Sequence, residues 1–597
     1  MVNGASVERT IQTLPPAAIL MLSLVLCASG LYIAADLICS TKLYQHKPFR
    51  CLCLLTPPIL AGLAAFFLPI SPINDSMAFY RALAQFLEYG ALSPSFTRPY
   101  FAFYANNLIA LMPYRVAVML ANDVRLGVRL VNFLCAFIAV FCFSCSVGKI
   151  FGKNRQMFSA LICTLLFPYI ILTSPYIYPI SIALTSLVFC LSFPGCRAKK
   201  PFLFLVTGIL FLMRPTAAIL VFVSYAFLTF RHFIRREKTE ALKSLGVIIL
   251  LFVSLYVTQL GVGAALLRAG LHPFPNLLSG STNWTLDIGT RFDGFNTGSS
   301  TYVPYGALPQ HLRDDEIAVM QNRVWNYLAT GDINDLQNLT NLNRELRAAI
   351  ANRTVEIILY NPTNIPRFYF YKSARLFGVS AYRLYFYSLN VHSPTFGQEL
   401  RSNIEADAEV HFLAVIILSA IGIVFAFVRC IIKRRFDDRA LYALSSAMAC
   451  IAVIFIVLSL TEVAQRTLLD IFIPAAFAIC SMMIFLMDDF DVVTRLATKS
   501  KIIAAVLLAL GLIVAGYTFS SNNLGFLRGA DFELSQEDGI IALEITLTQD
   551  PPAHGHYFVI QEQQIPLSRR MILEIEIGET LYLQTPRRIF RISTFAY

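Results

Sequence analysis

Charged residues are scarce in this chain. Asp, Glu, Lys and Arg make up only 14% of its 597 residues, whereas hydrophobic residues make up 56%, and the mean hydropathy is +0.62. A soluble domain carries roughly 25% charged residues. This scarcity excludes an ordinary soluble globular protein and predicts a chain built for lipid.

Disulfides and metal motifs are also missing where an external protein would carry them. None of the 13 cysteines falls in the three longest segments between apolar runs, residues 70–127, 268–408 and 520–597, so we expect no disulfide framework there. Cys142 and Cys145 form the one CxxC pair, but it lies in an apolar run and we assign it to packing. His554 and His556 lack a third ligand. We therefore assign no metal and no cofactor.

Long apolar runs recur along the sequence. A helix needs about 20 mostly apolar residues to cross a hydrocarbon core about 30 Å thick. The N-terminus has no cationic region or small-residue cleavage site, so we expect the first run to be retained. We predict about 12 transmembrane helices, near residues 16–38, 51–69, 128–147, 157–173, 178–195, 200–213, 216–231, 245–267, 409–428, 440–460, 467–486 and 502–519.

The basic residues of short loops predict the orientation. Such loops are cytoplasmic by the positive-inside rule, and they account for the net charge of +11 without nucleic acid. Helices then alternate correctly only if residues 101–120 lie along the outer interface instead of crossing. The basic loops contain Lys42, Lys47, Arg50; Lys149, Lys153, Arg155; Arg197, Lys199, Lys200; Arg231, Arg235, Arg236, Lys238; and Lys433, Arg434, Arg435, Arg439.

These patterns predict an all-α polytopic membrane protein with extracytoplasmic loops and a small C-terminal β-rich domain. Within the first external segment, residues 70–127, a helix is expected from Met77 to Glu88. Apolar and polar residues alternate after residue 520, as in strands. The parts are an N-terminal span with a cytoplasmic loop (1–50), a transmembrane module (51–267), a large external loop (268–408), C-terminal transmembrane helices (409–519) and the β-rich tail (520–597).

The middles of the predicted spans carry essentially no charge. A proton- or ion-coupled transporter would place charged groups at that depth. Unexplained charges gather instead at the ends that we expect to be external: Asp75, Arg81, Arg214, Glu462, Arg466 and Asp470. Snorkelling anchors are the simpler interpretation of each residue alone. Anchoring cations, however, belong on the cytoplasmic face.

Asp75 is the candidate catalytic residue. It follows the apolar run that ends near Ile70, so it is expected at a membrane exit, half-shielded from water and reachable by a polar acceptor. A carboxylate there suits a general base acting on a lipid-borne substrate. The alternative is a cap for the helix that begins at Met77.

Arginines are the candidate ligands of a lipid phosphate, because their planar donors suit that group. Arg214 precedes a helix-breaking proline, and Arg466 occupies a comparable outer turn. An i,i+4 pair with Glu462 is the alternative role of Arg466. Further candidates are Lys372 and Arg375, which lie in an amphipathic stretch expected on the bilayer surface.

Aromatic and acidic residues are candidates for binding the sugar or acceptor. Tyr80 and Trp284 suit stacking on a sugar, with a membrane-belt position as the alternative. Asp287 suits contact with the acceptor, with turn formation as the alternative. Arg81 and Glu462 complete the candidate substrate-binding set.

Four stretches together resemble a known group of enzymes. They are Asn74-Asp75 followed by Phe79-Tyr80 and Leu87-x-x-Gly90; Trp284 to Asn296; Pro366 to Arg375; and Glu462 to Arg466 leading to Pro474. In this order, over residues 50–490, they resemble the GT-C glycosyltransferases, with bacterial relatives of the protein O-mannosyltransferases as the nearest group. The chain departs from that pattern in having Asn74-Asp75 in place of an Asp-Glu pair, Thr467 after Arg466, and an additional N-terminal span.

The resemblance implies a multi-pass enzyme of the plasma membrane whose active site faces the extracytoplasmic side. It implies transfer from a polyprenyl-phosphate-sugar donor to a hydroxyl of a glycan, lipid or protein, with inversion at the anomeric carbon. Asp75 matches the family's catalytic aspartate, which makes 51–267 the catalytic module. The residues leave open a lipid-linked polysaccharide polymerase or ligase, a lipid-linked sugar flippase and a non-catalytic scaffold.

Overall fold

The fold was analysed in a computed structural model of the chain. It describes residues 2–67, 75–92, 100–101, 105–166, 177–192, 200–268, 319–320, 323–324, 326, 336–360, 410–425, 428–429, 451–453, 472–489, 503, 506–511, 513, 531–537, 540–546, 557–560, 563–566, 570–576, 580–585 and 588–594.

Apolar helices dominate the described part of the chain and give it the character of a membrane protein, as the composition predicted. By length and composition, four of the described helices can cross a membrane: α1 (Val2–Ser40), α3 (Lys47–Phe67), α7 (Val124–Phe151) and α13 (Lys238–Arg268). Shorter apolar helices are α6 (Ala105–Ala121), α10 (Ile177–Ser192), α11 (Lys200–Met213), α12 (Pro215–Ile234), Val410–Phe425 and α22 (Phe472–Asp489).

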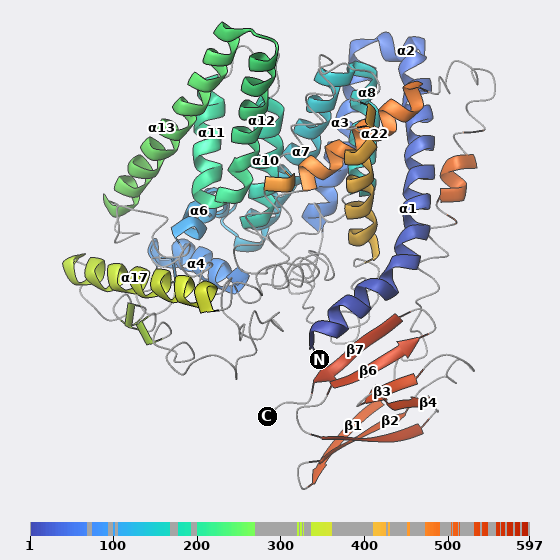
Figure 1. The fold of residues 1–597 in the computed structure, drawn as a ribbon, viewed down its shortest axis with the longest axis vertical. Helices are drawn as coiled ribbons and strands as arrows, with labels where there is room; N and C mark the ends of the chain where they lie inside the picture. Colours follow the sequence, from blue (N-terminus) through green and yellow to red (C-terminus); the bar gives the residue numbers. More distant parts are fainter. Residues whose placement is uncertain are drawn as a thin grey trace.

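The helix bundle has two distinct ends (Figure 1). The short helix α2 (Lys42–Gln45) and the turn between α12 and α13 lie at one end, which we call the basic end because Lys42, Arg235 and Arg236 belong to it. Helix α4 (Asp75–Tyr89) and α6 lie at the opposite end, which we call the α4 end. Consecutive helices from α10 to α13 run alternately between the two ends, with α11 and α12 meeting at Arg214.

Helix α7 is the central packing element. It contacts α3, α4, α6, α10 and α8 (Lys153–Leu166). Its buried residues contribute to two hydrophobic cores. One core joins α1, α3, α8, α10, α22 and neighbouring helices, and the other lies at the α4 end. Burial on several sides explains why α7 is apolar over most of its length.

A partly buried ion pair joins α1 to α8. Arg155 Nη1 lies 2.9 Å from Asp36 Oδ1, and the two side chains are 17% and 22% exposed. The guanidinium also lies over the ring of Tyr32, 4.1 Å from its centroid. Tyr32 is fully buried and packs edge-on against Phe158 of α8. Arg155 of α8 therefore pairs with a carboxylate and packs on an aromatic ring, both of which belong to α1.

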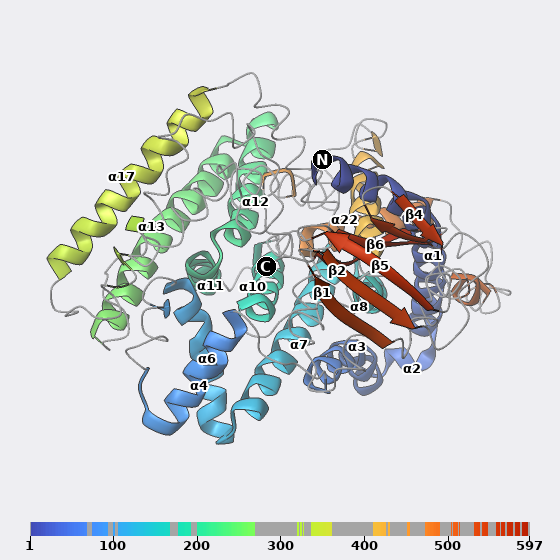
Figure 2. The same cartoon turned by 90° about the horizontal axis from the view of Figure 1, so that it is seen from below.

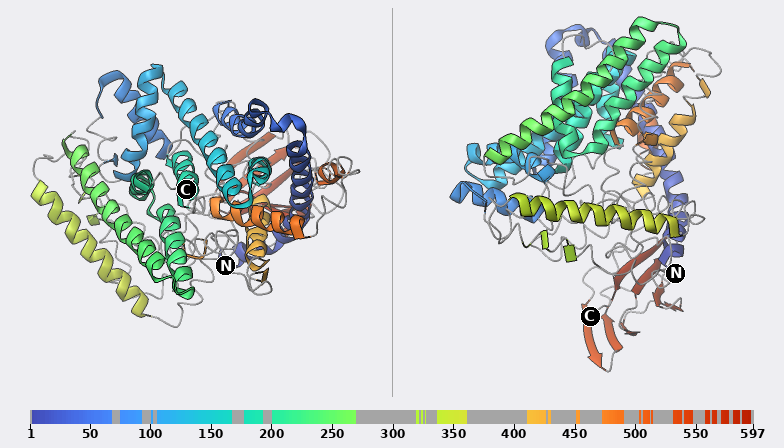
Figure 3. Two further views of the ribbon diagram at one scale, coloured as in Figure 1. Left: turned by 90° about the horizontal axis from the view of Figure 1, so that it is seen from above. Right: turned by 60° about the vertical axis from the view of Figure 1, so that its left-hand side comes forward.

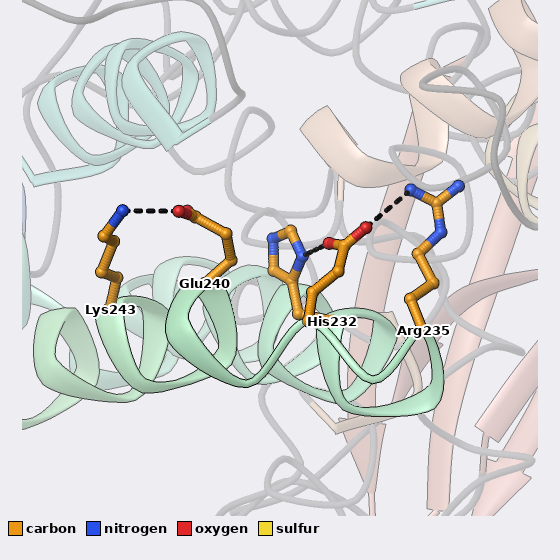
Figure 4. A network of polar contacts seen from close by, with 5 residues as sticks. His232, Arg235, Glu240 and Lys243 are labelled. Carbon is orange, nitrogen blue, oxygen red and sulfur yellow. Dashed lines mark hydrogen bonds and ion pairs between the residues drawn. The ribbon is translucent and has the colours of Figure 1, made fainter.

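The turn between α12 and α13 carries a polar network (Figure 4). Glu237 contacts the ring of His232, and its other oxygen lies 3.8 Å from Arg235 Nη1. Arg236 has a φ of 60°, in the left-handed region that a tight reversal requires. In the first turns of α13, Lys243 Nζ lies 2.5 Å from Glu240 Oε1 in an exposed pair. These contacts fix the reversal between two apolar helices.

A further helix lies at the α4 end of the bundle. Helix α17 (Leu336–Tyr360) runs crosswise beneath the bundle, unlike the helices above it (Figures 1 and 3). Its mean polarity is far higher than that of the bundle helices, and its hydrophobic residues do not form a long apolar run. This helix falls within residues 268–408, the predicted large external loop.

Antiparallel strands occur in the C-terminal part of the chain, next to the N-terminal end of α1 (Figures 1 and 2). The sheet orders are β1-β2-β5 and β4-β3-β6-β7, and β7 contacts α1. Leu543 pairs with Leu573 and Ile545 with Met571, so apolar residues of the alternating pattern are opposite one another. The strands are β1 (Asp531–Glu537), β2 (Ile540–Thr546), β3 (Tyr557–Ile560), β4 (Gln563–Pro566), β5 (Arg570–Glu576), β6 (Thr580–Thr585) and β7 (Arg588–Thr594).

Replacing Asp36 with Asn should destabilise the protein, because Arg155 then keeps its charge in a poorly solvated site. We expect a loss of about 2 kcal/mol, between the values for exposed and fully buried pairs. Thermal unfolding in detergent, followed by intrinsic fluorescence, measures it. The matched control is Lys243→Gln in the exposed pair with Glu240, which should change stability by less than about 0.5 kcal/mol. Equal effects of the two substitutions would contradict a special role of the Asp36–Arg155 pair.

Candidate functional site

Four of the candidate site residues belong to the described part of the chain. Asp75, Tyr80 and Arg81 lie on α4, and Arg214 lies between α11 and α12. Of Asp75 the structure describes the backbone. The candidates that lie outside the described residues are Trp284, Asp287, Lys372, Arg375, Glu462 and Arg466.

Helix α4 begins at Asp75, two residues before the start expected from the sequence. Asp75 therefore lies in the first helical turn instead of preceding the helix. A carboxylate in a first turn interacts favourably with the unpaired N–H groups and positive end of the helix dipole. This position keeps both interpretations of Asp75 open, because a carboxylate in the first turn can stabilise the helix start and can also accept a proton.

One face of α4 is buried and orients the helix. The buried residues recur at helical spacing, and the largest, Phe79, packs edge-on against Phe101 with the ring centroids 5.4 Å apart. Tyr80 is half-buried beside this core, and Arg81 is exposed. Arg115 of α6 lies over the ring of Phe86, 4.2 Å from its centroid. The buried face consists of Ala78, Phe79, Ala82, Leu83 and Phe86.

Buried hydrogen bonds fix α6 against its neighbours. Tyr114 Oη donates to Asn132 Oδ1 of α7 at 2.9 Å, and Asn107 Nδ2 donates to Tyr100 Oη at 2.8 Å. All four side chains are buried. Satisfied polar groups in an apolar core specify one arrangement, because any other arrangement leaves them unpaired. The sequence pattern did not predict this role of Asn107.

The α6–α7 contact depends on a glycine. A Cβ atom on Gly127 would lie 2.6 Å from the backbone N and Cα of Val118. Backbone atoms cannot move aside like the end of a flexible side chain, so Gly127 permits this close approach. Gly127 also lies in the first turn of α7, where its backbone N–H donates to Asp123 O at 3.0 Å. The carboxylate of Asp123 caps the same helix by accepting from Leu126 N at 2.6 Å.

Arg214 lies at the break between two apolar helices. It is 8% exposed and occupies the N-cap position of α12, with Pro215 next in the helix. Its backbone N–H donates to Leu210 O at 2.7 Å, which closes the last turn of α11. Pro215 suits the first helical position because its N–H would be unpaired there in any case. The sequence correctly predicted the break at this dipeptide.

The core at the α4 end links these residues. Leu212 and Met213, directly before Arg214, belong to the same core as Phe79 and Leu83 of α4. Helix α6 contacts both α4 and α11 and so connects them. Asp75 and Arg214 therefore belong to elements that pack at one end of the bundle, which the spacing of 139 residues between them could not have indicated.

The side chains of Asp75 and Arg214 determine what chemistry the α4 end can support. A first-turn carboxylate can accept a proton, and an arginine at a helix start lies beside N–H groups suited to an anion. Within the described part of the chain, no group of three His, Cys, Asp or Glu side chains is arranged to hold a metal ion.

Comparisons with known proteins give no further assignment: no protein-family model, no curated protein and no solved structure matches the chain. The functional interpretation therefore depends on the residues and on their arrangement.

Replacing Gly127 with Ala should destabilise the α6–α7 contact. Overpacking typically costs about 1–3 kcal/mol, and here backbone atoms would have to shift. The matched control is Gly246→Ala in α13, where an added Cβ meets nothing within 4 Å. Because Ala is the better helix former, that change should be neutral or stabilising by up to about 1 kcal/mol. Thermal unfolding in detergent compares the two, and a stabilising Gly127→Ala would contradict the proposed contact.

Proposed function

We propose that the protein is an inverting glycosyltransferase. It moves a sugar from a polyprenyl-phosphate donor to a hydroxyl of a glycan, lipid or protein on the outer face of the membrane. The observation that supports this most is the shared core of the α4 end, which brings the helix starting at Asp75 and the Arg214 break to one end of the bundle.

Asp75 is the proposed general base. Its carboxylate accepts the proton of the acceptor hydroxyl while the hydroxyl oxygen attacks the anomeric carbon from the face opposite the phosphate. The bond from that carbon to the phosphate oxygen then breaks, and the lipid phosphate leaves as an anion. No second catalytic acid is needed, because this leaving group requires no proton. General-base catalysis contributes typically about 10²–10⁴ in rate.

Arg214 is the proposed ligand of the departing phosphate. Its guanidinium offers several donors in a plane, and its low exposure of 8% would strengthen charge interactions relative to water. The start of α12 adds the positive end of a helix dipole. Arg466, Lys372 and Arg375 are proposed to extend this phosphate site.

The proposed sugar and acceptor contacts come from residues of the first external segment (70–127), from residues of the large external loop (268–408) and from Glu462. We propose that Tyr80 and Trp284 stack on the sugar, whose faces carry C–H groups suited to aromatic rings. Arg81, Asp287 and Glu462 are proposed to hydrogen-bond the sugar or the acceptor. Among these, Tyr80 and Arg81 follow Asp75 by less than two helical turns on α4.

The proposed topology has about 12 spans in the plasma membrane. The basic end faces the cytoplasm, and the α4 end, α17 and the small β-rich domain face outward. Support comes from the basic residues of α2 and of the α12–α13 turn, which lie at the end opposite α4 (Figure 1).

Asp75→Asn should abolish transfer while the protein stays folded. The amide cannot accept the proton, so we expect a loss of about 10²–10⁴ in rate. Transfer from a radiolabelled polyprenyl-phosphate sugar is measured in membranes, with surface glycans and polyprenyl phosphates followed by mass spectrometry in cells. The matched control is Glu88→Gln, an exposed carboxylate at the other end of α4, which should retain activity.

The cellular measurement also separates the competing functions. Loss of one sugar from surface glycans, together with accumulation of its single-sugar lipid donor, supports the transferase. Accumulation of a lipid-linked oligosaccharide indicates a polymerase or ligase, and accumulation on the cytoplasmic face alone indicates a flippase. Unchanged glycans in an Asp75→Asn strain with normal protein level would refute the proposal.

Arg214→Gln should weaken use of the lipid donor and slow transfer, because the phosphate loses a charged ligand in a poorly hydrated site. We expect a loss of about 10²-fold in kcat/KM. Arg214→Lys should retain part of the activity, since it keeps the charge but not the planar donors. Arg235→Gln at the basic end is the control and should leave kcat/KM unchanged. Equal activity of the Gln and Lys variants at wild-type level would exclude Arg214 from the site.

A further inference from the structure

A second candidate site lies away from the α4 end, toward the basic end of α7 and α10. A cavity of about 630 Å³ is bordered there by α7, α10 and the start of α11. Its wall is apolar except for three thiols and one ammonium group. The residues that matter here are Cys142, Cys145, Lys149 and Cys190, together with the apolar Phe141 and Phe202.

Helices α7 and α10 approach closely next to this cavity. Ser186 Oγ of α10 donates to Ala139 O of α7 at 2.6 Å, so small residues face one another at the contact. Cys142 and Cys190 follow by three and four residues, one helical turn further along both helices. Both side chains line the cavity and are largely buried. A disulfide between them requires Cα atoms about 4.4–6.8 Å apart, which the close approach of the two helices at this level favours.

Lys149 supplies a cation to one of the two thiols. Its Nζ lies 3.2 Å from Cys190 Sγ and 3.2 Å from Cys190 O. A thiolate, not a thiol, is the nucleophile, and an adjacent ammonium group favours the thiolate. The carbonyl contact alone would make Lys149 a cap for the C-terminal end of α10. The contact with the sulfur is what points to reactivity.

The third thiol has a different environment. Cys145 Sγ accepts a hydrogen bond from Gln156 Nε2 of α8 at 3.3 Å, and Gln156 is neutral. Cys163 and Cys480 are fully buried in the core, away from this cavity. The combination of a partner thiol, a cation and a cavity thus distinguishes Cys142 and Cys190 from these three.

We infer that Cys142 and Cys190 form a redox-active dithiol, which low-molecular-weight disulfides such as glutathione disulfide oxidise to a cross-link between α7 and α10. The Cys190 thiolate attacks one sulfur of the disulfide, and the other half leaves as a thiolate that takes up a proton. The Cys142 thiol then loses its proton and attacks the Cys190 sulfur, releasing the second half as a thiol. Two protein thiols are oxidised, and one disulfide is reduced to two thiols.

The test uses the full-length reduced protein in detergent, with glutathione disulfide as the probe. Samples are quenched by alkylation, digested and analysed by mass spectrometry over time. The wild type should form a Cys142–Cys190 disulfide that dithiothreitol reverses. Cys190 should react about 10-fold faster than Cys51, an exposed thiol of α3. Equal or slower reaction of Cys190 would overturn the inference without any variant.

Variants assign the role of each group. Cys142→Ser should stop the reaction at a mixed disulfide of glutathione on Cys190, whereas Cys145→Ser should leave the cross-link unchanged. Lys149→Gln should slow the reaction of Cys190 about 10-fold, and Lys149→Arg should restore most of it. If Lys149→Gln lowers thermal stability but leaves the Cys190 rate unchanged, Lys149 is only a helix cap and the inference fails. Transfer activity is not the readout, so this result is independent of the proposed function.

Discussion

The constraint on which this structure depends is that hydrocarbon offers no hydrogen-bond partner. Backbone groups are satisfied within helices. Several buried hydroxyls bond their own helix, as Ser146, Thr207 and Ser224 do by donating to the carbonyl four residues earlier, and others, such as Ser186, donate to a neighbouring helix. Ion pairs with larger separation in sequence, such as Asp36 with Arg155, lie toward helix ends. Polar chemistry is therefore concentrated at the two ends of the bundle.

Helix α7 connects the two ends of the bundle and makes specific contacts at each. At the α4 end it accepts the Tyr114 hydrogen bond through Asn132 and the close approach of Val118 at Gly127. At the basic end it carries Lys149 and the thiol of Cys142. The proposed transfer site and the proposed dithiol thus share one rigid element, although they use chemically unrelated groups.

The sequence predicted the membrane character and several helix boundaries, because hydropathy and proline act locally. The break at Arg214-Pro215 is an example, and the helix expected from Met77 to Glu88 is present but begins two residues earlier, at Asp75. It could not predict which helices are neighbours. The buried hydrogen bond of Asn107 to Tyr100 had no sign in the sequence pattern, and Cys142 was assigned to packing with no sign of Cys190 or Lys149 near it. Such pairings depend on tertiary contacts between distant segments.

Helix α13 has a consequence for the surrounding bilayer. Its apolar stretch from Leu245 to Leu267 extends about 35 Å, whereas the hydrocarbon core is about 30 Å thick. Large apolar side chains such as Phe252, Tyr256 and Leu260 are exposed along it. An apolar stretch slightly longer than the hydrocarbon core favours inclination of the helix or local thickening of the lipid around it. Membrane thickness, and hence acyl-chain length, should therefore influence how α13 rests against α11 and α12.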